Sequence, residues 1–145
     1  MKAKMQMPKT KKELANLIAT SGRRKTAVAR IFLYQEKGEF TVNDQPINDY
    51  FPTEKEKLKW MKPFHLVGVS HPTTQFRATI KVEGSGKTSQ LGAILLALSK
   101  ALGKINGDYN SLLKKQGLMT RDPRMVERKK YWYRKARKTP QYSKR

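Results

Sequence analysis

Apolar and polar residues alternate over the first well-patterned part of the chain, residues 22–36. Every second residue from Ala27 to Leu33 would lie on one apolar face, because successive side chains of a strand point to opposite faces. This alternation predicts one long strand. The glycine-containing segment 37–39 predicts a hairpin turn, and residues 39–43 are expected to return as the antiparallel partner.

The middle of the chain begins with helix signals. Asp44 and Pro46 favour a short helical turn that reaches Tyr50. Residues 53–56 have the spacing of a capping box, so a longer helix is expected to begin there and to end at Pro63.

Two strand-like segments follow, at residues 64–70 and 74–84. They are separated by residues 70–72, where Pro72 suits a turn. The sequence therefore predicts a second antiparallel pair.

Helical spacing dominates the chain after the glycine turn at residues 84–86. A helix is expected up to Gly103, and a second one from Asp108 to Gln116 that docks through Leu112 and Leu113. The apolar stripe of the first helix consists of Leu91, Ile94, Leu95, Leu98 and Leu102.

The two ends of the chain lack such patterns. Residues 1–12 have no periodicity, and only a short helix over 13–20 is expected beside them. Beyond Arg121 too little apolar surface recurs to offset the entropy of ordering. The expected organisation is a mobile basic arm over 1–20, one globular domain over 21–120 and an extended basic tail over 121–145.

Charge is concentrated at these ends. The 145 residues have a formal net charge of +21, of which residues 1–25 contribute +7 and residues 121–145 contribute +9. An ordinary solvated surface would mix charges of both signs. Two cationic arms on a globular body of nearly ordinary charge therefore indicate a polyanionic partner. Nucleic acid is the obvious one.

Several kinds of chemistry are disfavoured by composition. The chain has no cysteine, and its two histidines, His65 and His71, lack the neighbouring ligands of a metal site. The longest apolar run, 91–98, is too short to cross a bilayer. The first twenty residues lack a signal-peptide core, so a cytoplasmic location is expected, without a membrane partner.

The segment "GSGKT" at residues 84–88 resembles part of a nucleotide-binding phosphate loop. The full motif requires a glycine where this chain has Lys81, and its strand is almost wholly apolar, whereas Arg77 to Glu83 alternates. A glycine turn before a helix is the favoured interpretation. The helix start could still meet an RNA phosphate, because its free N–H groups attract anions.

The C-terminal segment mixes aromatic residues with cations. Its aromatic residues are Tyr131, Trp132, Tyr133 and Tyr142. Planar rings can stack on unpaired bases while Arg and Lys neutralise phosphates, so this mixture favours RNA binding over a merely solvated charge run.

Three motifs give the chain a family resemblance. They are "SGRRKTAVARIFL" at 21–33, "VEGSGKTSQLGAI" at 82–94 and "GLMTRDPRMVERKKYWYRKARKTPQYSKR" at 117–145. Together they resemble the small-subunit ribosomal protein nine family in its bacterial or organellar form, over residues 21–145. The resemblance implies an α/β (α+β) domain with a four-stranded sheet and a left-handed βαβ crossover, and a long extended basic tail.

The resemblance also implies partners and sites. The partners are small-subunit ribosomal RNA in the head, neighbouring head proteins and the anticodon stem-loop of peptidyl-site transfer RNA, without a cofactor, a metal, a catalytic residue or a homo-oligomer. The ribosomal RNA contacts implied are Arg23, Arg24, Lys25, Arg121, Arg124, Arg128, Lys129, Lys130, Arg134, Lys135, Arg137 and Lys138. The transfer RNA contacts implied are Ser143, Lys144 and Arg145.

Two departures from the family pattern are present. Residues 88–93 replace a Ser-Gly-Gln-Ala-Gly-Ala run, and Trp132 stands where the family commonly has glycine. The leading hypothesis is a noncatalytic structural protein of the cytoplasmic ribosome, or of an organellar one. The alternatives are a small nucleotidase or RNA-modifying enzyme, and a free RNA-annealing protein.

Overall fold

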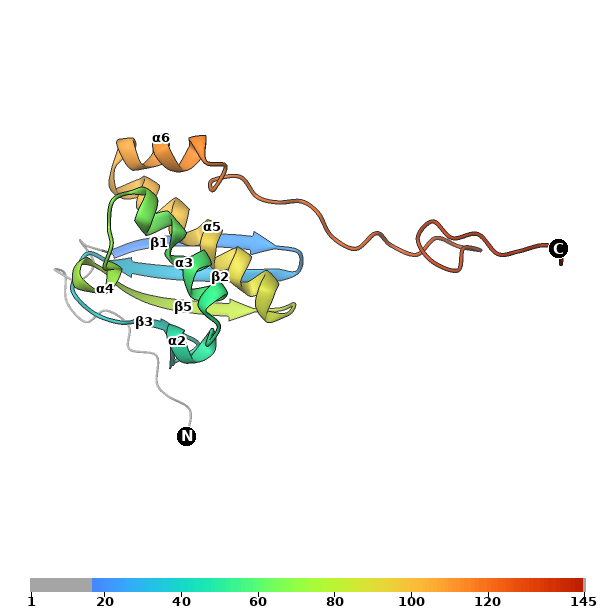
Figure 1. Ribbon diagram of the computed structural model, residues 1–145, viewed down its shortest axis with the longest axis horizontal. Coiled ribbons are helices and arrows are strands. Elements are labelled where there is room, and N and C mark those ends of the chain that lie inside the picture. The colour runs from blue at the N-terminus through green and yellow to red at the C-terminus, as the bar shows by residue number, and fades with distance from the viewer. Residues whose placement is uncertain (1–16, 145) are drawn as a thin grey trace.

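Five strands form one mixed sheet in the computed structural model, which describes residues 17–144 (Figure 1). In chain order they are β1 (Leu17–Arg24), β2 (Ala27–Tyr34), β3 (Phe40–Val42), β4 (Gln45–Pro46) and β5 (Arg77–Glu83). Their order in the sheet is β1-β2-β5-β3-β4. All neighbouring strands are antiparallel except β3 and β5, which are parallel.

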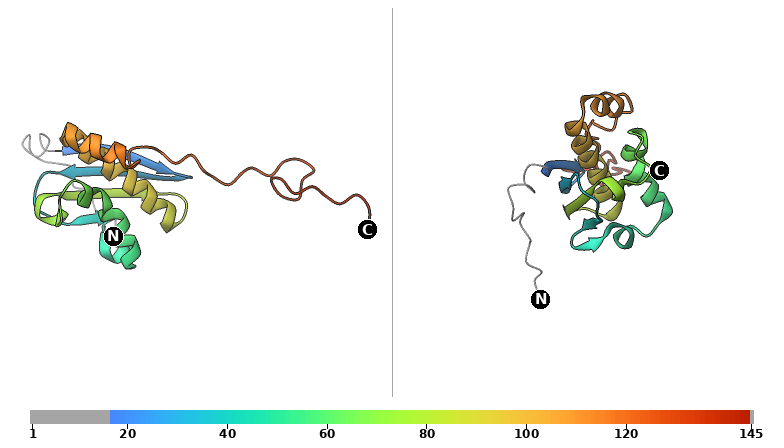
Figure 2. Two further views of the ribbon diagram at one scale, coloured as in Figure 1. Left: turned by 45° about the horizontal axis from the view of Figure 1, so that its top comes forward. Right: turned by 90° about the vertical axis from the view of Figure 1, so that its left-hand side faces the viewer.

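Helices connect these strands and follow the last of them. They are α2 (Ile47–Tyr50), α3 (Glu54–Leu66), α4 (Pro72–Gln75), α5 (Lys87–Ile105) and α6 (Gly107–Lys115). Both α3 and α5 are on the same side of the strands, and α6 continues beside α5 (Figures 1 and 2). Within residues 17–144, no helix covers the opposite face, which we call the open face of the sheet.

The main core lies between β2, β5 and α5. Ala29, Ile31 and Leu33 of β2 are completely buried, and Ile94 and Leu98 of α5 are buried against this layer. Each such Ile or Leu stabilises the fold by about 1.5–3 kcal/mol relative to an exposed position. The predicted apolar face of this strand is therefore confirmed.

Close packing of β1 on α5 depends on Gly22. A Cβ atom added to Gly22 would overlap the backbone oxygen of Ala93 and lie 2.8 Å from the backbone N of Ala97. The Thr20 hydroxyl donates a hydrogen bond to the Ala97 carbonyl at 2.9 Å. Backbone therefore packs directly on backbone at this point.

The predicted pairing of the strands is wrong. The segment from 22 to 36 is not one strand: it is broken at Lys25 and Thr26, where Lys25 has a φ of 51°, and β1 pairs with β2 across that turn. Residues 37–39 form no hairpin, because β3 pairs with β5 and not with β2. The tight turn at Lys25 lacks the Asn or Gly that usually marks such a bend, so no local pattern predicts it.

The predicted strand at 64–70 is also wrong. Helix α3 begins after Thr53 as predicted, but it passes through Pro63 and ends at Leu66. Phe64 is fully buried, with its ring centroid 5.6 Å from that of Phe40 and 6.5 Å from that of Trp60. Burial of this aromatic cluster outweighs the helix-breaking tendency of proline near the end of the helix.

Other boundaries are partly confirmed. The short turn ending at Tyr50 is α2, and the last two helices are present. However, α5 continues beyond Gly103 to Ile105, and only Leu113 of the predicted docking pair is buried, because Leu112 is 46% exposed.

The N-terminal prediction is corrected for its described part. Leu17 to Thr20 belong to β1 and not to a helix, so the sheet begins before residue 21. Residues 1–16, which include the rest of the predicted arm, lie outside the described residues. The sheet has five strands where four were expected, because the two-residue β4 joins its edge. The crossover handedness and the division into arm, domain and tail stay predictions.

Candidate nucleic-acid interface

The first group of predicted RNA contacts lies at the turn between β1 and β2. Arg23 and Lys25 are exposed there, on a bend that projects from the body of the protein. Arg24 lies on the side of α5, with 22% of its side chain exposed. A Cβ atom added to Gly92 of α5 would lie 3.2 Å from Cγ of Arg24, so this helix glycine leaves room for the arginine.

Arg24 connects this turn to the start of the C-terminal tail. Its guanidinium lies 3.0 Å from the Asp122 carboxylate and donates a hydrogen bond of 2.6 Å to the carbonyl of Arg124. Arg124 donates to the same carboxylate from its backbone N–H at 2.9 Å and from Nη2 at 2.7 Å. We call Arg24, Asp122 and Arg124 the tail anchor, because these contacts fix where the tail leaves the domain.

The sequence analysis named both arginines of the tail anchor but missed Asp122. An acid inside a cationic segment is the signal that could have found it, since a carboxylate there can pair two guanidinium groups. A cavity of about 190 Å³ lies beside the anchor, between the end of β1, α5 and the chain after α6. Two predicted contact groups, far apart in sequence, thus lie side by side.

The Asp122 carboxyl should stay ionised at unusually low pH. Its pKa lies well below the ordinary value of 3.8, chiefly because the Arg124 side chain and backbone N–H donate hydrogen bonds to the charged form. A lowered folded-state pKa means that the anchor's stabilisation is complete above pH 3.8 and is lost only as the pH falls through the lower value. Carboxyl ¹³C NMR of Asp122 across an acid titration measures this.

A matched pair of variants tests the cause. Arg124→Gln should raise the titration midpoint of Asp122 towards 3.8, whereas Lys129→Gln, a neutralisation in the same tail without contact to Asp122, should leave it unchanged. A midpoint of 3.8 in the unaltered chain would contradict the anchor.

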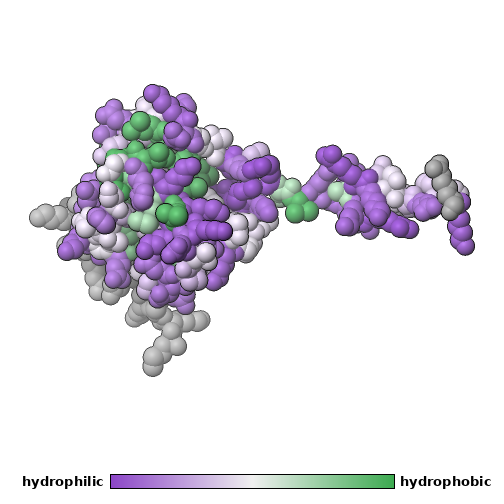
Figure 3. Space-filling view, viewed as in Figure 1, coloured by the Kyte–Doolittle hydropathy of each residue, from purple (hydrophilic) through white to green (hydrophobic). Residues whose placement is uncertain are grey.

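Residues 121–144, in the predicted C-terminal tail, form a segment that extends away from the sheet and its helices (Figure 1). This segment contains neither helix nor strand, and its surface is largely hydrophilic but is interrupted by a hydrophobic patch (Figure 3). Nine predicted contacts are exposed along it: Arg121, Arg124, Arg128, Lys129, Lys130, Arg134, Lys135, Arg137 and Lys138.

A loop interrupts the extended course of the tail. Glu127 pairs with Nε of Arg137 at 2.9 Å and with Nζ of Lys130 at 3.4 Å, and these two partners keep the pKa of Glu127 below its ordinary value. The backbone N–H of Arg134 donates to the carbonyl of Lys138 at 2.7 Å. We call residues 127–138 the tail loop. Arg137 is 86% exposed despite its pairing, so an RNA phosphate can still reach it.

The predicted tip is only partly described. Ser143 and Lys144 are exposed, and the Ser143 carbonyl accepts a hydrogen bond from the Gln141 side chain at 2.6 Å. Arg145 lies outside the described residues. The C-terminal end of the described chain lies far from the sheet and its helices (Figure 1).

The open face of the sheet adds cations that the sequence analysis did not select. Arg30 is exposed at the centre of β2, opposite Lys81 of β5, and Arg77 lies over the Tyr34 ring with its Cζ 4.8 Å from the centroid. The alternation in β2 and β5 could have located them, because every residue between the buried ones faces outwards.

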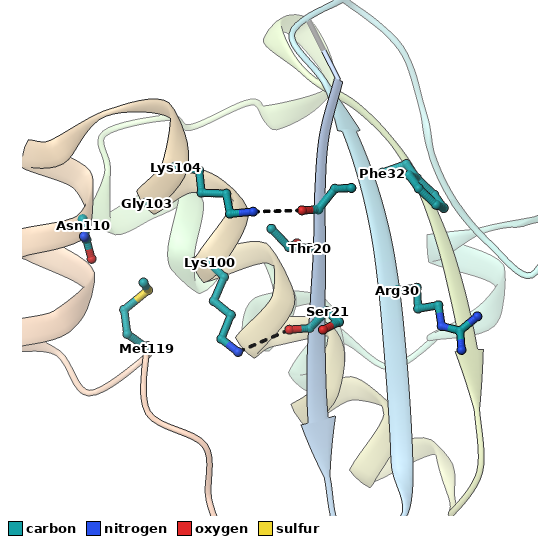
Figure 4. Close-up of a pocket in the computed structure, with 10 residues that line it drawn as sticks. Thr20, Ser21, Arg30, Phe32, Lys100, Gly103, Lys104, Asn110 and Met119 are labelled. Carbon is teal, nitrogen blue, oxygen red and sulfur yellow. Dashed lines mark hydrogen bonds between the residues drawn. The ribbon is translucent and has the colours of Figure 1, made fainter. Parts of the chain in front are cut away.

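Lysines of α5 protect the free edge of β1. Nζ of Lys100 donates to the Ser21 carbonyl at 3.3 Å, and Nζ of Lys104 donates to the Ala19 carbonyl at 3.1 Å (Figure 4). A cavity of about 550 Å³ lies beside this edge and is also lined by Arg30. Charged side chains on an edge strand discourage pairing with another chain.

The glycine turn does not have the arrangement of a nucleotide site. Lys87 points away from the turn: its Nζ lies 3.4 Å from the Tyr50 carbonyl and 5.5 Å from the centre of the Tyr50 ring. The Gly84 carbonyl accepts a hydrogen bond from the Gln90 side chain. Strand β5 lies in a mixed sheet, parallel to β3 but antiparallel to β2, whereas phosphate-loop strands belong to parallel sheets.

Two features are absent from residues 17–144. No three His, Cys, Asp or Glu side chains gather there in a way that could hold a metal ion. None of the helices there is both long and apolar enough to cross a bilayer.

Comparison with known proteins identifies the family. The model of the family described as ribosomal protein S9/S16 matches residues 22–145. Small ribosomal subunit protein uS9 of Chlorobaculum tepidum is 44% identical over 132 residues, which cover 91% of this chain and all of that protein. The proteins of the same name from Rickettsia felis and Thermus thermophilus are 42% and 46% identical, over 100% and 86% of this chain and 88% and 95% of their own lengths. The chain therefore belongs to the ribosomal protein S9/S16 family.

Proposed function

We propose that the protein is a structural, noncatalytic component of the small ribosomal subunit, where it binds ribosomal RNA. The observation that supports this most directly is the tail anchor, which joins a globular domain to a long cationic segment with exposed Lys and Arg. Ordered cations on an extended chain suit the regularly spaced phosphates of RNA. The relatives are named small ribosomal subunit proteins, which supports the same assignment.

The ribosomal RNA site has two parts in this proposal. The first part is the β1–β2 turn with the tail anchor, where Arg23, Arg24 and Lys25 lie next to the start of the tail. The second part is the tail itself. Its contacts are Arg121, Arg124, Arg128, Lys129, Lys130, Arg134, Lys135, Arg137 and Lys138.

Phosphate contacts hold RNA in place without reading its sequence. The tail anchor lies between the cations of the β1–β2 turn and those of the tail. Phosphate contacts on both sides of it would fix the direction in which the tail enters the RNA. Arg30 and Arg77 of the open face are available as further phosphate contacts. The head of the subunit, beside other head proteins, is the site implied by the resemblance, and the protein would act there as one copy.

The end of the tail has a separate role in this proposal. Ser143, Lys144 and Arg145 would contact the anticodon stem-loop of transfer RNA in the peptidyl site. The extended tail supports a transfer RNA contact at its end, because the end of the described chain lies far from the sheet and helices and could reach a separate RNA (Figure 1). A guanidinium fork and an ammonium group both suit backbone phosphates, so any transfer RNA would be held alike.

The alternatives receive no specific support from the described residues. An enzyme needs a positioned acid, base or nucleophile, and the GSGKT turn directs Lys87 towards Tyr50. A free RNA-annealing protein would use the same cationic tail but would not need a fixed exit point from the domain.

Recovery with ribosomes tests the proposal against the annealing alternative. Intact small subunits purified through a high-salt wash should contain one copy of this chain per subunit. A small fraction of a copy, or loss of the chain at a salt concentration that leaves the other subunit proteins in place, would contradict the proposal.

Removal of the tip should weaken transfer RNA binding but not assembly. A chain that ends at Tyr142 loses the cations Lys144 and Arg145, and each exposed ionic contact contributes up to about 1 kcal/mol. Peptidyl-site affinity for transfer RNA should therefore fall several-fold on subunits that contain this variant. The measurement is equilibrium binding, with the assembly yield of the subunits recorded in parallel.

A Ser143→Ala variant is the matched control, because it keeps both cations and should retain almost all of the affinity. Unchanged binding by the shortened chain, or failure of its subunits to assemble, would contradict a role of the tip in transfer RNA binding.

A further inference from the structure

The tail loop holds one residue in an unusual backbone conformation. Trp132 has a φ of 68°, in the left-handed region that bulky L-residues rarely adopt. Contacts on both sides hold the loop: the backbone N–H of Tyr133 donates to the Lys130 carbonyl at 3.3 Å, and Glu127 pairs with Arg137. Backbone strain of this kind persists only where surrounding contacts maintain it, and it gathers at functional positions.

The strained conformation brings no burial of the indole. Trp132 remains 70% exposed, and its neighbour Tyr131 is 83% exposed. Their rings meet edge to face, with centroids 5.5 Å apart and an angle of 76° between the ring planes. This contact supports the position of each ring without covering its face. Trp60, in contrast, is buried in the core with only 3% exposed. The tail loop therefore keeps a large aromatic face in solvent.

Cations flank Trp132 along the chain. Lys129 and Arg134 lie close to it in the chain and are exposed, and Lys135 follows them. An exposed indole with cations before and after it in the sequence suits a nucleotide, because the base can stack on the ring while its flanking phosphates are neutralised. A protein pocket for the indole would not explain so many neighbouring positive charges.

We propose that Trp132 stacks on an unpaired RNA base, and that the tail loop is the device that presents its ring. This proposal rests on the proposed RNA-binding function and adds a base-stacking site to it. The Glu127 ion pairs hold the loop closed before RNA arrives, which lowers the entropy cost of ordering the ring on binding. Stacking tolerates any base, so the site would select unpaired RNA over duplex and not one sequence.

Tryptophan fluorescence of the full chain provides a direct test. Trp60 is buried and serves as an internal reference, so the difference between the unaltered chain and Trp132→Phe reports on Trp132. The probes are a short single-stranded RNA and an oligonucleotide with the same sugar-phosphate backbone but no bases. We expect the first probe to quench Trp132 strongly and the second to leave it nearly unchanged, although both bind through phosphates.

Affinity measurements on variants complete the test. Trp132→Asn removes the ring and keeps a residue that tolerates positive φ, so it should weaken binding of the single-stranded RNA by roughly 5- to 150-fold. Its affinity for the abasic probe should not change. Trp132→Phe should recover much of the loss, and Val126→Ala, at another exposed apolar residue of the tail, should cause none.

Distinct outcomes separate this proposal from the one on which it rests. Equal losses on both probes, or absence of base-dependent quenching while RNA still binds, would overturn stacking and leave the RNA-binding function in place. Failure of the unaltered chain to bind either probe at low salt would overturn both.

Discussion

A chain that ends at Thr120 is expected to bind ribosomal RNA at least about 1,000-fold more weakly than the full chain at ~0.1 M salt, because it should retain only nonspecific attraction. The truncation removes residues 121–145, whose net charge of +9 exceeds the +7 of residues 1–25 and the +5 of residues 26–120. It also removes Asp122 and so leaves Arg24 without its tail partner. Equilibrium binding to a head-domain RNA fragment measures the loss.

Salt dependence should reveal the same contacts independently. If the tail neutralises roughly 6–10 phosphates, log affinity of the full chain should fall against log salt with a slope of about −4 to −9. The truncated chain should give a much shallower slope, because fewer counterions are released when it binds.

A scrambled tail is the matched control for charge alone. It keeps the composition of residues 121–145 but moves Asp122, Arg124 and Glu127 out of their present contacts. We expect it to restore most of the salt slope but only part of the affinity, because its phosphate contacts are not held in register. A salt-independent affinity of the full chain would contradict the proposed mechanism of binding.

Gly22→Ala should be the most destabilising single substitution among those considered. The added methyl group would overlap the Ala93 carbonyl and lie 2.8 Å from the backbone N of Ala97, and neither backbone atom can rotate away. The clash can be relieved only if β1 moves away from α5. This movement would also strain the hydrogen bond from Thr20 to the Ala97 carbonyl. We expect the free energy of unfolding to fall by about 1–3 kcal/mol or more, measured by denaturant unfolding.

Gly107→Ala is the matched control. Gly107 begins α6, and an added Cβ there would have no heavy atom within 4 Å. In a helix, alanine at an unstrained position should leave the stability unchanged or raise it by about 0.4–1 kcal/mol. Similar losses for both variants would show that the contact of Gly22 with α5 is not what makes that position sensitive.

Local patterns predicted much of the secondary structure, and the errors have a common cause. Period-two alternation located β2 and β5, and helical spacing located α5 and α6, because each pattern depends only on which face is buried. Pairing of strands depends on distant partners. The parallel contact of β3 with β5 was missed because a glycine between two strand-like segments suggested a hairpin that the fold does not form.

In the candidate site, too, local patterns located single residues but not their distant partners. Charge and the family resemblance selected Arg24 and Arg124, but nothing in their spacing indicates that Asp122 joins them across about one hundred residues of chain. The positive φ of Trp132 was equally hidden, since an aromatic residue gives no signal for a left-handed conformation. Such features follow from contacts that form only when the chain has folded.

The sequence by itself determined where apolar periodicity stops: residues 121–145 are too rich in charge and too poor in periodic apolar residues to build a core. These properties depend only on the residues within each segment, through their composition and their spacing. Only the tertiary structure decided that β1 packs on α5 through Gly22, that α3 continues past Pro63, and where the tail leaves the domain. The physical reason is that backbone approach, burial of an aromatic cluster and ion pairing between distant residues are settled by the packing of the whole chain, which can outweigh local preference.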